Sequence, residues 1–530
     1  MHAVETFEII LTLLALVLAL HWVALKLKLP PATVLLVGGG ALAFVPGLPS
    51  ITLDPELALV LFLPPLLVDG AFYTPLGRFR RQLPGILSLA VGAVVFTTFC
   101  VGVVVHWLVP SLPWAACFAL GAIVSPPDAV SARAVLAGVK LPRRLTTLLE
   151  GESLLNDATG LILFRFAVAA TLSGVFHLGE AVQGFFVLAV GGLIVGVAIG
   201  YAWVFIVPRL GDRMSVIFVT ALLSWVAYLA GEAVHVSGVI AAVSAGLVQG
   251  WYQHEVLPAG ARLQGRSVSE IIVFVLEALV FILIGFSLRG VVERIGESGG
   301  LASETVLTIL GVIAAVVVAR FIWVLLSDFL LGVLYLLGLK SAKPLGWRQG
   351  VVLSWAGMRG VVTLAIPLSL PLDMPGRDLM LLSAFAVIFF TVILQGSSLG
   401  WLIRLVKPVD SEPPAKMSMA QTEAAMSRAR AATARKLAHA PDGTLIHPYL
   451  LQMHEQRLQF MEKYEKDAST VMEGVREHID LQIATLTSGR KELIRVHRAG
   501  LIEDNVLHNL ERDLDVEEMG MFFQRDDDPG

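Results

Sequence analysis

The chain has 530 residues, of which 56% are hydrophobic and only 15% are charged. A soluble fold cannot hide that much apolar side chain, so the composition predicts a membrane protein. The 39 Lys and Arg residues nearly balance the 43 Asp and Glu residues, and no aromatic-interleaved basic run of the kind that binds nucleic acid is present. We therefore exclude nucleic acid as a partner. The two cysteines, both in apolar stretches, exclude a disulfide framework and a cysteine metal site.

The first 400 residues or so contain apolar stretches close to the length of about 20 residues that spans a bilayer. About thirteen spans are predicted, at residues 5–25, 31–47, 55–75, 84–109, 113–136, 145–173, 181–207, 215–231, 235–250, 270–288, 304–326, 349–370 and 379–405. We therefore expect a transmembrane domain over residues 1–408. The polar residues 409–530 contain helical patterns near 419–438, 447–488 and 490–520, which predict a helical cytoplasmic tail.

The charges of the loops predict the orientation. If the tail is cytoplasmic, the outward loops carry few basic residues, namely Arg289, Arg294 and Arg377. The inward loops carry Lys26, Lys28, Arg78, Arg80, Arg81, Lys140, Arg143, Arg144, Arg209, Arg213, Arg262, Arg266, Lys340, Lys343 and Arg348. Because cytoplasmic loops are enriched in Lys and Arg, we predict the N-terminus outside and the C-terminus inside. Thirteen spans also suit two six-helix halves in opposite orientations, joined by a linking span.

The fifth span contains the motif Ser-Pro-Pro-Asp at residues 125–128. Two consecutive prolines interrupt the helix and leave the carbonyls of Ala122 and Ile123 without their normal amide partners. Carbonyl groups beside the carboxylate of Asp128 predict a cation site. The alternative is a proline kink in which Asp128 caps the following half-helix.

The sixth span places Ser153 and Asp157 on one helical face, with Asn156 adjoining them. Hard monovalent cations prefer oxygen ligands, and a carboxylate can bind a proton in place of a cation. Asp157 would then have two mutually exclusive occupants, which is the requirement for antiport. The alternative is that Asp157 only forms hydrogen bonds between helices.

Two arginines lie within the later spans, Arg320 in the eleventh and Arg359 in the twelfth. Because buried arginines need partners, we predict the structural ion pairs Glu152 with Arg320 and Asp128 with Arg359. These pairs would leave Asp157 free to titrate. Four weaker candidates could line a vestibule or satisfy a neighbour; they are Asp69, Arg165, His235 and Glu277.

Together these motifs resemble the monovalent cation:proton antiporters that include the sodium/proton exchangers, particularly the bacterial NhaP-like branch. The resemblance extends over roughly 400 residues and rests on Leu63-Pro64-Pro65, Ser125 to Asp128, Gly151 to Asp157, Ser237-Gly238 and Gly357 to Gly360. It implies an all-α fold of about thirteen transmembrane helices in two inverted six-helix repeats with crossed broken helices. It also implies a homodimer in the cell membrane and no cofactor.

The resemblance implies roles for individual residues. Asp157 would be the ion- and proton-binding carboxylate, with Asn156, Ser153 and Asp128 near the ion. The Asn156-Asp157 pair is similar to that of exchangers that move one cation against one proton, which implies electroneutral exchange. Many relatives carry Thr-Asp-Pro in the broken helix, where this chain has Pro127-Asp128-Ala129. Since Pro127 has no hydroxyl, we expect Ser125, a carbonyl or water to complete the site, which leaves the cation preference open.

The sequence therefore predicts a secondary active transporter and not an enzyme. We expect electroneutral sodium(lithium)/proton antiport by alternating access, in which the cation and the proton compete for Asp157. The first alternative is a potassium/proton antiporter. Two alternatives from other classes are a cation channel and an intramembrane hydrolase that uses Asp128 and Asp157 as an acid/base pair.

Overall fold

The computed structural model describes residues 3–27, 29–45, 55–128, 141–297, 303–338, 344–371, 373–410, 412, 417–466 and 468–526. The chain divides into two compact units, Met1–Ser411 and Glu412–Gly530. The regular elements of the described residues are helices, apart from one isolated bridge between His439 and Leu445. This arrangement confirms the predicted fold class, an all-α polytopic membrane protein with a helical C-terminal region.

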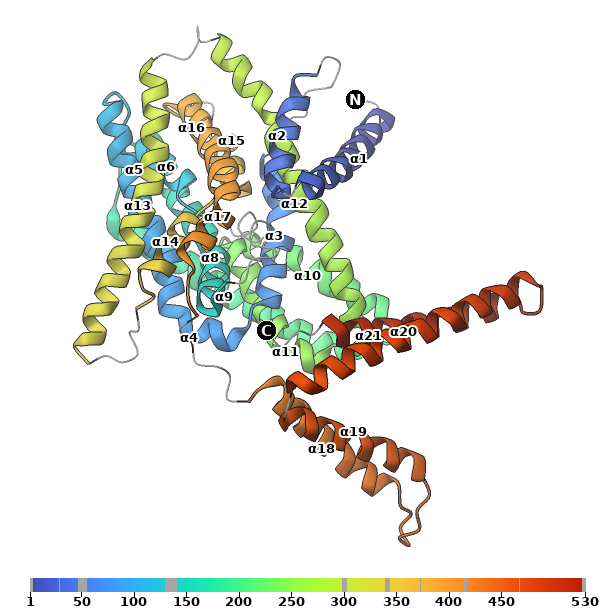
Figure 1. Cartoon of the computed structure of the whole chain (residues 1–530). Coiled ribbons are helices and arrows are strands. Elements are labelled where there is room, and N and C mark those ends of the chain that lie inside the picture. Colours follow the sequence, from blue (N-terminus) through green and yellow to red (C-terminus); the bar gives the residue numbers. More distant parts are fainter. Residues whose placement is uncertain are drawn as a thin grey trace. The chain divides into compact units, whose positions relative to one another are not determined.

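Each predicted span contains one helix or one pair of helices (Figure 1). The helices are α1 (Ala3–Leu27), α2 (Pro31–Ala43), α3 (Pro55–Tyr73), α4 (Leu76–Leu87), α5 (Val94–Leu108), α6 (Trp114–Val124), α8 (Arg143–Ser173), α9 (Leu178–Ile206), α10 (Arg213–Ala233), α11 (Gly238–Val256), α12 (Ala259–Glu297), α13 (Ser303–Leu336), α14 (Trp347–Trp355), α15 (Val361–Leu368), α16 (Arg377–Phe389) and α17 (Gly396–Val406). One π-helical turn joins α4 to α5 and another joins α16 to α17. Among the described residues, seven helical stretches have the length and apolarity to cross a membrane, and four shorter helices are also apolar.

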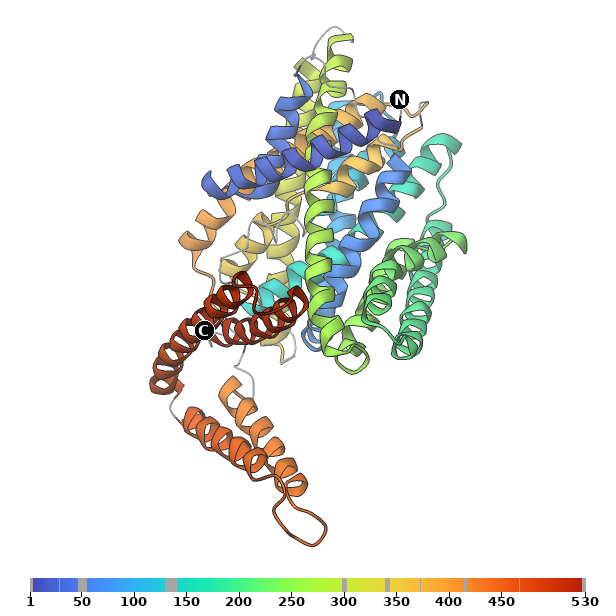
Figure 2. The ribbon, with the colours of Figure 1, turned by 90° about the vertical axis from the view of Figure 1, so that its right-hand side faces the viewer.

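The helices of the first unit approach one another closely at small residues. At the contact between α2 and α12, a Cβ added to Gly39 would meet the backbone of Ile282, and one added to Gly285 would meet the backbone of Leu36. Small residues permit such contacts in a bilayer, where lipid chains remove the hydrophobic drive that joins helices in water. Figure 2 shows α1 inclined to its neighbours at the outside of this unit.

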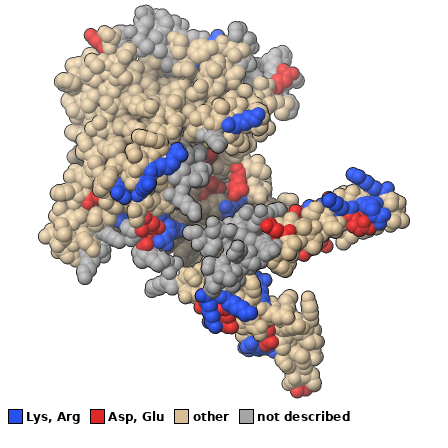
Figure 3. Space-filling view, in the orientation of Figure 1, with Lys and Arg blue, Asp and Glu red and all other residues tan. Residues whose placement is uncertain are grey.

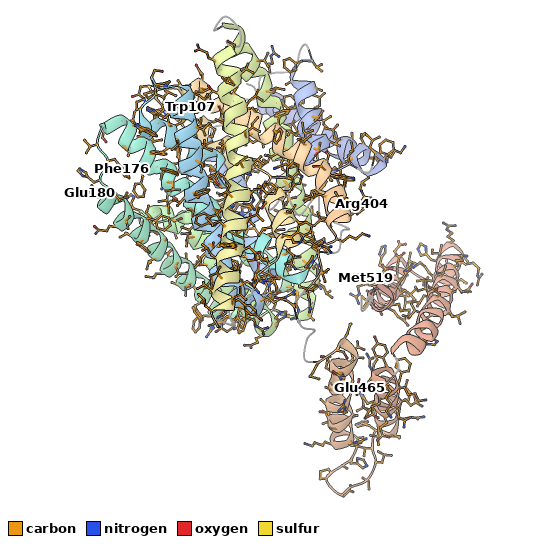
Figure 4. All side chains as sticks on the ribbon, turned by 60° about the vertical axis from the view of Figure 1, so that its left-hand side comes forward. Trp107, Phe176, Glu180, Arg404, Glu465 and Met519 are labelled. Atoms are coloured by element: carbon orange, nitrogen blue, oxygen red, sulfur yellow. The ribbon has the colours of Figure 1, made fainter. Side chains whose placement is uncertain are left out.

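The surface of the first unit is suited to lipid. On the face shown in Figure 3 most of this unit is uncharged, whereas the second unit carries many side chains of both signs. Trp107 in α5 is 79% exposed, and Phe176 between α8 and α9 is 58% exposed; both are labelled in Figure 4. Exposed aromatic and aliphatic side chains over such an area indicate a membrane-embedded surface.

The second unit consists of α18 (Met419–Leu437), α19 (Pro448–Lys466), α20 (Ala468–Arg498) and α21 (Asp504–Asp526). The labels of Glu465 and Met519 in Figure 4 mark α19 and α21. Helix α18 begins with a capping box formed by Ser418 and Gln421. The sequence predicted Gly500 as a break between tail helices, and the turn between α20 and α21 contains Gly500 with a φ of +70°.

Candidate functional site

Helix α6 ends at Val124, directly before the two consecutive prolines. Pro126 and Pro127 have no amide hydrogen, so they cannot continue the helical hydrogen bonds. The amide of Asp128 instead donates to the carbonyl of Met358 across 2.6 Å. Met358 lies in the gap between α14 and α15, so the two interrupted segments meet at their breaks. The half-helix predicted after Asp128, within the span 113–136, falls on residues outside the described part of the chain.

Arg359 fills the space between these breaks and is 1% exposed. Its Nε donates to the carbonyl of Val124 at 3.0 Å, its Nη2 donates to the carbonyl of Ser125 at 3.3 Å, and its Nη1 donates to the carbonyl of Gly357. A guanidinium therefore neutralises the carbonyl end of α6. The sequence predicted an ion pair of Arg359 with Asp128, and the structure corrects this. The carbonyl of Val124 needs a donor because the amide of Asp128, its partner in a continuous helix, bonds to Met358.

The carboxylate of Asp128 lies against Gly360, the residue that precedes the first turn of α15. A Cβ added to Gly360 would overlap Oδ2 of Asp128. A negative charge at this end of a helix is favourable, because the first amides of the helix carry partial positive charge. The carboxylate of Asp128 thus lies at the start of α15 and not beside the guanidinium of Arg359.

This contact predicts that Gly360→Ala lowers both stability and transport. The new methyl group would displace the Asp128 carboxylate, and overpacking of this kind costs about 1–3 kcal/mol. Thermal unfolding of the purified protein would measure the loss. Gly400→Ala is the matched control, because a Cβ at Gly400 has no neighbour within 4 Å. Equal melting temperatures for the two variants would contradict the contact.

Glu152 and Arg320 form a buried bidentate ion pair. Nη1 of Arg320 lies 2.6 Å from Oε1 of Glu152, and Nη2 lies 2.9 Å from Oε2. The two side chains are 2% and 3% exposed. Arg320 also donates to the carbonyl of Leu353 at the end of α14. The structure therefore brings together the two residues that the sequence paired, and it joins α8 to α13 and α14 through them.

A cavity of about 70 Å³ lies beside these breaks, which is room for a few water molecules or a partly hydrated ion. Its polar lining includes Asp128, Glu150, Ser153, Asp157 and Thr363. Asp157 is 9% exposed and its carboxylate takes no hydrogen bond or ion pair from the residues that the structure describes. The cavity thus holds a buried carboxylate whose binding capacity is not used by described protein groups.

The other predicted ligands take different positions. Asn156 is fully buried; its Nδ2 donates to the carbonyl of Pro127, and its Oδ1 has no hydrogen-bond partner in the described structure. Ser125 is not part of the cavity lining, because its hydroxyl accepts from Thr98 at 3.1 Å and donates to the carbonyl of Ala122 at 3.3 Å. The structure thus brings Asp128, Ser153 and Asp157 together, and it occupies the carbonyl of Ala122, which was predicted to face a cation.

Sequence reasoning assigned no role to Glu150 and Thr363, which also line the cavity. Glu150 precedes Asp157 by seven residues, which is two turns of α8, so helical spacing could have found it. Thr363 comes from α15, and no local pattern relates it to α8. It follows the break in the twelfth span, and only the packing of α15 against α3 and α6 brings it to the site.

A second, larger cavity of about 730 Å³ lies between α3, α10, α11 and α12. Asp69 lines it and accepts a hydrogen bond from Ser269 at 2.7 Å. Tyr73 lines both cavities, so α3 forms the wall between them. Of the other weak candidates, Arg165 pairs with Glu232 at 3.3 Å at a half-exposed site, and His235 is exposed at the end of α10.

Proteins of similar sequence identify the family of the chain. The family model described as "Sodium/hydrogen exchanger, transmembrane" matches residues 11–405. The chain is 36% identical over 406 residues to a sodium, potassium, lithium and rubidium/proton antiporter of Bacillus pumilus, covering 74% of this chain and 60% of that relative's length. It is 30% identical over 521 residues to an uncharacterised sodium/proton exchanger of Mycobacterium tuberculosis, covering 94% of this chain and 93% of that one.

The fold also matches a solved structure, that of the sodium proton antiporter MjNhaP1 from Methanocaldococcus jannaschii. The TM-score is 0.58 at 19% identity, and the match covers 77% of this chain and all of MjNhaP1. At this identity the likeness concerns the fold. The family match and the similarity to the full-length mycobacterial exchanger carry the assignment. The chain therefore belongs to the sodium/hydrogen exchanger family, whose members are cation:proton antiporters, that is, secondary transporters and not enzymes.

Proposed function

We propose that this protein exchanges sodium or lithium for protons, one for one, by alternating access. The observation that carries the proposal is the carboxylate of Asp157, which lines a buried cavity and takes no hydrogen bond from described groups. Glu152, which lies on α8 like Asp157, is already neutralised by its ion pair with Arg320. Asp157 therefore has the capacity to bind either a cation or a proton, and each occupant excludes the other.

The charges around this carboxylate support electroneutral exchange. The adjacent residue, Asn156, carries a neutral amide that holds the carbonyl of Pro127. Asp128 lies at the start of α15, where the helix compensates its charge. If Asp157 alone changes its occupant, one monovalent cation leaves for each proton that binds. The net charge of the site is then the same in both loaded states.

Alternating access requires that the cavity open to each side in turn. The larger cavity behind α3 offers an approach that shares Tyr73 with the ion cavity. Movement of α3 relative to α8 and α15, which it contacts, would connect or separate the two spaces. The outward N-terminus, the cytoplasmic tail, the cell membrane location and the homodimer that the resemblance implies are part of the same proposal.

Potassium is the second candidate ion, and two observations favour keeping it. The Bacillus pumilus relative is named for sodium, potassium, lithium and rubidium. Pro127 also gives the cavity no hydroxyl with which to select a small ion. Selectivity depends on the number and field strength of the oxygen ligands, so the ion has to be identified by measurement.

The test is cation-driven proton movement in proteoliposomes, followed with a pH-sensitive dye. Sodium, lithium and potassium gradients are applied separately, with and without an imposed membrane potential. We expect exchange with sodium or lithium at a rate that the potential does not change. A rate that follows the potential would overturn electroneutrality, and current without proton coupling would favour a channel. If no cation moves protons, the antiporter proposal fails.

A further inference from the structure

Besides the hydroxyl of Ser153, the cavity has few neutral oxygen ligands for a cation. Pro127 has no hydroxyl, and the hydroxyl of Ser125 bonds to Thr98 and Ala122 away from the cavity. The amide nitrogen of Asn156 bonds to the carbonyl of Pro127. A dehydrated alkali cation needs several oxygen ligands, so a further neutral oxygen beside Asp157 and Ser153 would help to complete the set.

Thr363 has a hydroxyl group in a position to be a further neutral oxygen ligand of the cation. Its side chain is 1% exposed and lines the cavity with Asp157. Its hydroxyl has no hydrogen bond within the described part of the chain. Some other buried threonines bond to the carbonyl four residues earlier in their own helix, as Thr147 does to Arg143 and Thr308 does to Glu304. Because α15 begins only at Val361, the residue four positions before Thr363 lies outside the helix.

A buried hydroxyl without a protein partner is unfavourable unless something else binds it. Water alone could satisfy the group, but the adjacent carboxylate of Asp157 makes the space attractive to a cation. The two side chains also come from different halves of the chain, Asp157 from α8 and Thr363 from α15. A cation held by both would connect the interrupted segment α14–α15 to α8.

We propose that Thr363 is a cation ligand of the antiport site and determines its preference among alkali ions. The inference rests on the proposed function and deepens it. The hydroxyl oxygen binds the cation beside Asp157, whereas a proton needs only the carboxylate. Loss of the hydroxyl therefore weakens cation binding and leaves proton binding unchanged. The oxygen of Thr363 takes the place of the hydroxyl group that Pro127 lacks.

The experiment compares Thr363→Val, which keeps the shape and removes the hydroxyl, with Thr363→Ser, which keeps the hydroxyl. Apparent KM values for sodium, lithium and potassium are measured in proteoliposomes. We expect the valine variant to raise the KM of the transported cation by roughly tenfold or more, as for loss of a hydrogen-bonding group to a charge. We expect the serine variant to stay near the native value. The pH of half-maximal exchange at saturating cation should be unchanged in both.

Thr308→Val is the matched control, because Thr308 is equally buried at 1% exposure but bonds within its own helix. It should keep native KM values. Native KM values for Thr363→Val, or an equal loss in the valine and serine variants, would overturn the inference. If the valine variant does not fold, Thr363→Ala provides the same comparison. Suppose that the native protein exchanges cations for protons, that Asp157→Asn abolishes this exchange and that Thr363→Val leaves it unchanged. This result would refute only the role of Thr363. If the native protein shows no exchange, the proposed function is refuted as well.

Discussion

Asp157→Asn is expected to reduce cation-driven proton exchange to the level of protein-free liposomes while the protein still folds. Asparagine has nearly the same shape but cannot bind or release a proton in this role, and it offers a weaker ligand to a cation. Because Asp157 has no ion-pair partner among the described residues, its loss leaves no buried charge uncompensated. Dye-monitored exchange would measure transport, and size-exclusion chromatography with thermal unfolding would report the fold.

The comparison needs variants of the other carboxylates that line the cavity. Asp157→Glu keeps the charge and should retain part of the exchange with an altered cation affinity. Glu150→Gln removes a carboxylate two turns away on the same helix and should retain exchange. Native exchange by Asp157→Asn would show that another group, Asp128 or Glu150, carries the proton.

Arg320→Met is expected to have the largest effect on stability. It leaves the carboxylate of Glu152, which is 2% exposed, without its partner, and it removes the donor to the carbonyl of Leu353. Removing one member of a buried ion pair costs about 3–5 kcal/mol, because the remaining charge is still desolvated. The yield of monodisperse protein and its melting temperature would both fall.

An exposed ion pair that joins α8, the helix of Glu152, to α10 provides the control. Arg165 and Glu232 are 47% and 33% exposed, and pairs of this kind contribute about 0–1 kcal/mol. Arg165→Gln should therefore melt close to the native protein. The double variant Glu152→Arg with Arg320→Glu, which swaps the two charges, should recover part of the stability that Arg320→Met loses. Equal melting of Arg320→Met and Arg165→Gln would refute the structural role of the buried pair.

Much of the fold could be predicted, because a chain that spans a bilayer needs long apolar segments that are easily recognised in its sequence. Apolar length marked the spans, and the two prolines before Asp128 marked the break in α6. The pairing of Glu152 with Arg320 could be proposed because both are charges that a membrane span should exclude. The residues after Asp128, where the other half of the fifth span was predicted, lie outside the described chain, so that half-helix stays a prediction.

The site was harder to predict, because its decisive contacts involve backbone groups. Arg359 bonds to carbonyls, which every residue possesses and no sequence pattern distinguishes. The carboxylate of Asp128 lies against Gly360, at the start of a helix whose position depends on the break there. Thr363 reaches the cavity only through long-range packing of α15. Sequence patterns reveal charged side chains in an apolar segment more readily than they reveal backbone groups with unusual hydrogen-bond partners.

The breaks of the two interrupted segments depend on each other during synthesis. The guanidinium that bonds to the carbonyl of Val124 belongs to a residue 235 positions later in the chain. At translation rates of about 5–20 residues per second, that residue emerges on the order of ten to fifty seconds after the carbonyl. The first break must therefore stay close to water or a chaperoning partner during that interval. A chain terminated before α14 would lack Arg359, so the carbonyl of Val124 would keep no donor at the centre of the bundle. We expect such a chain to be degraded, so that only completely synthesised chains form a stable site.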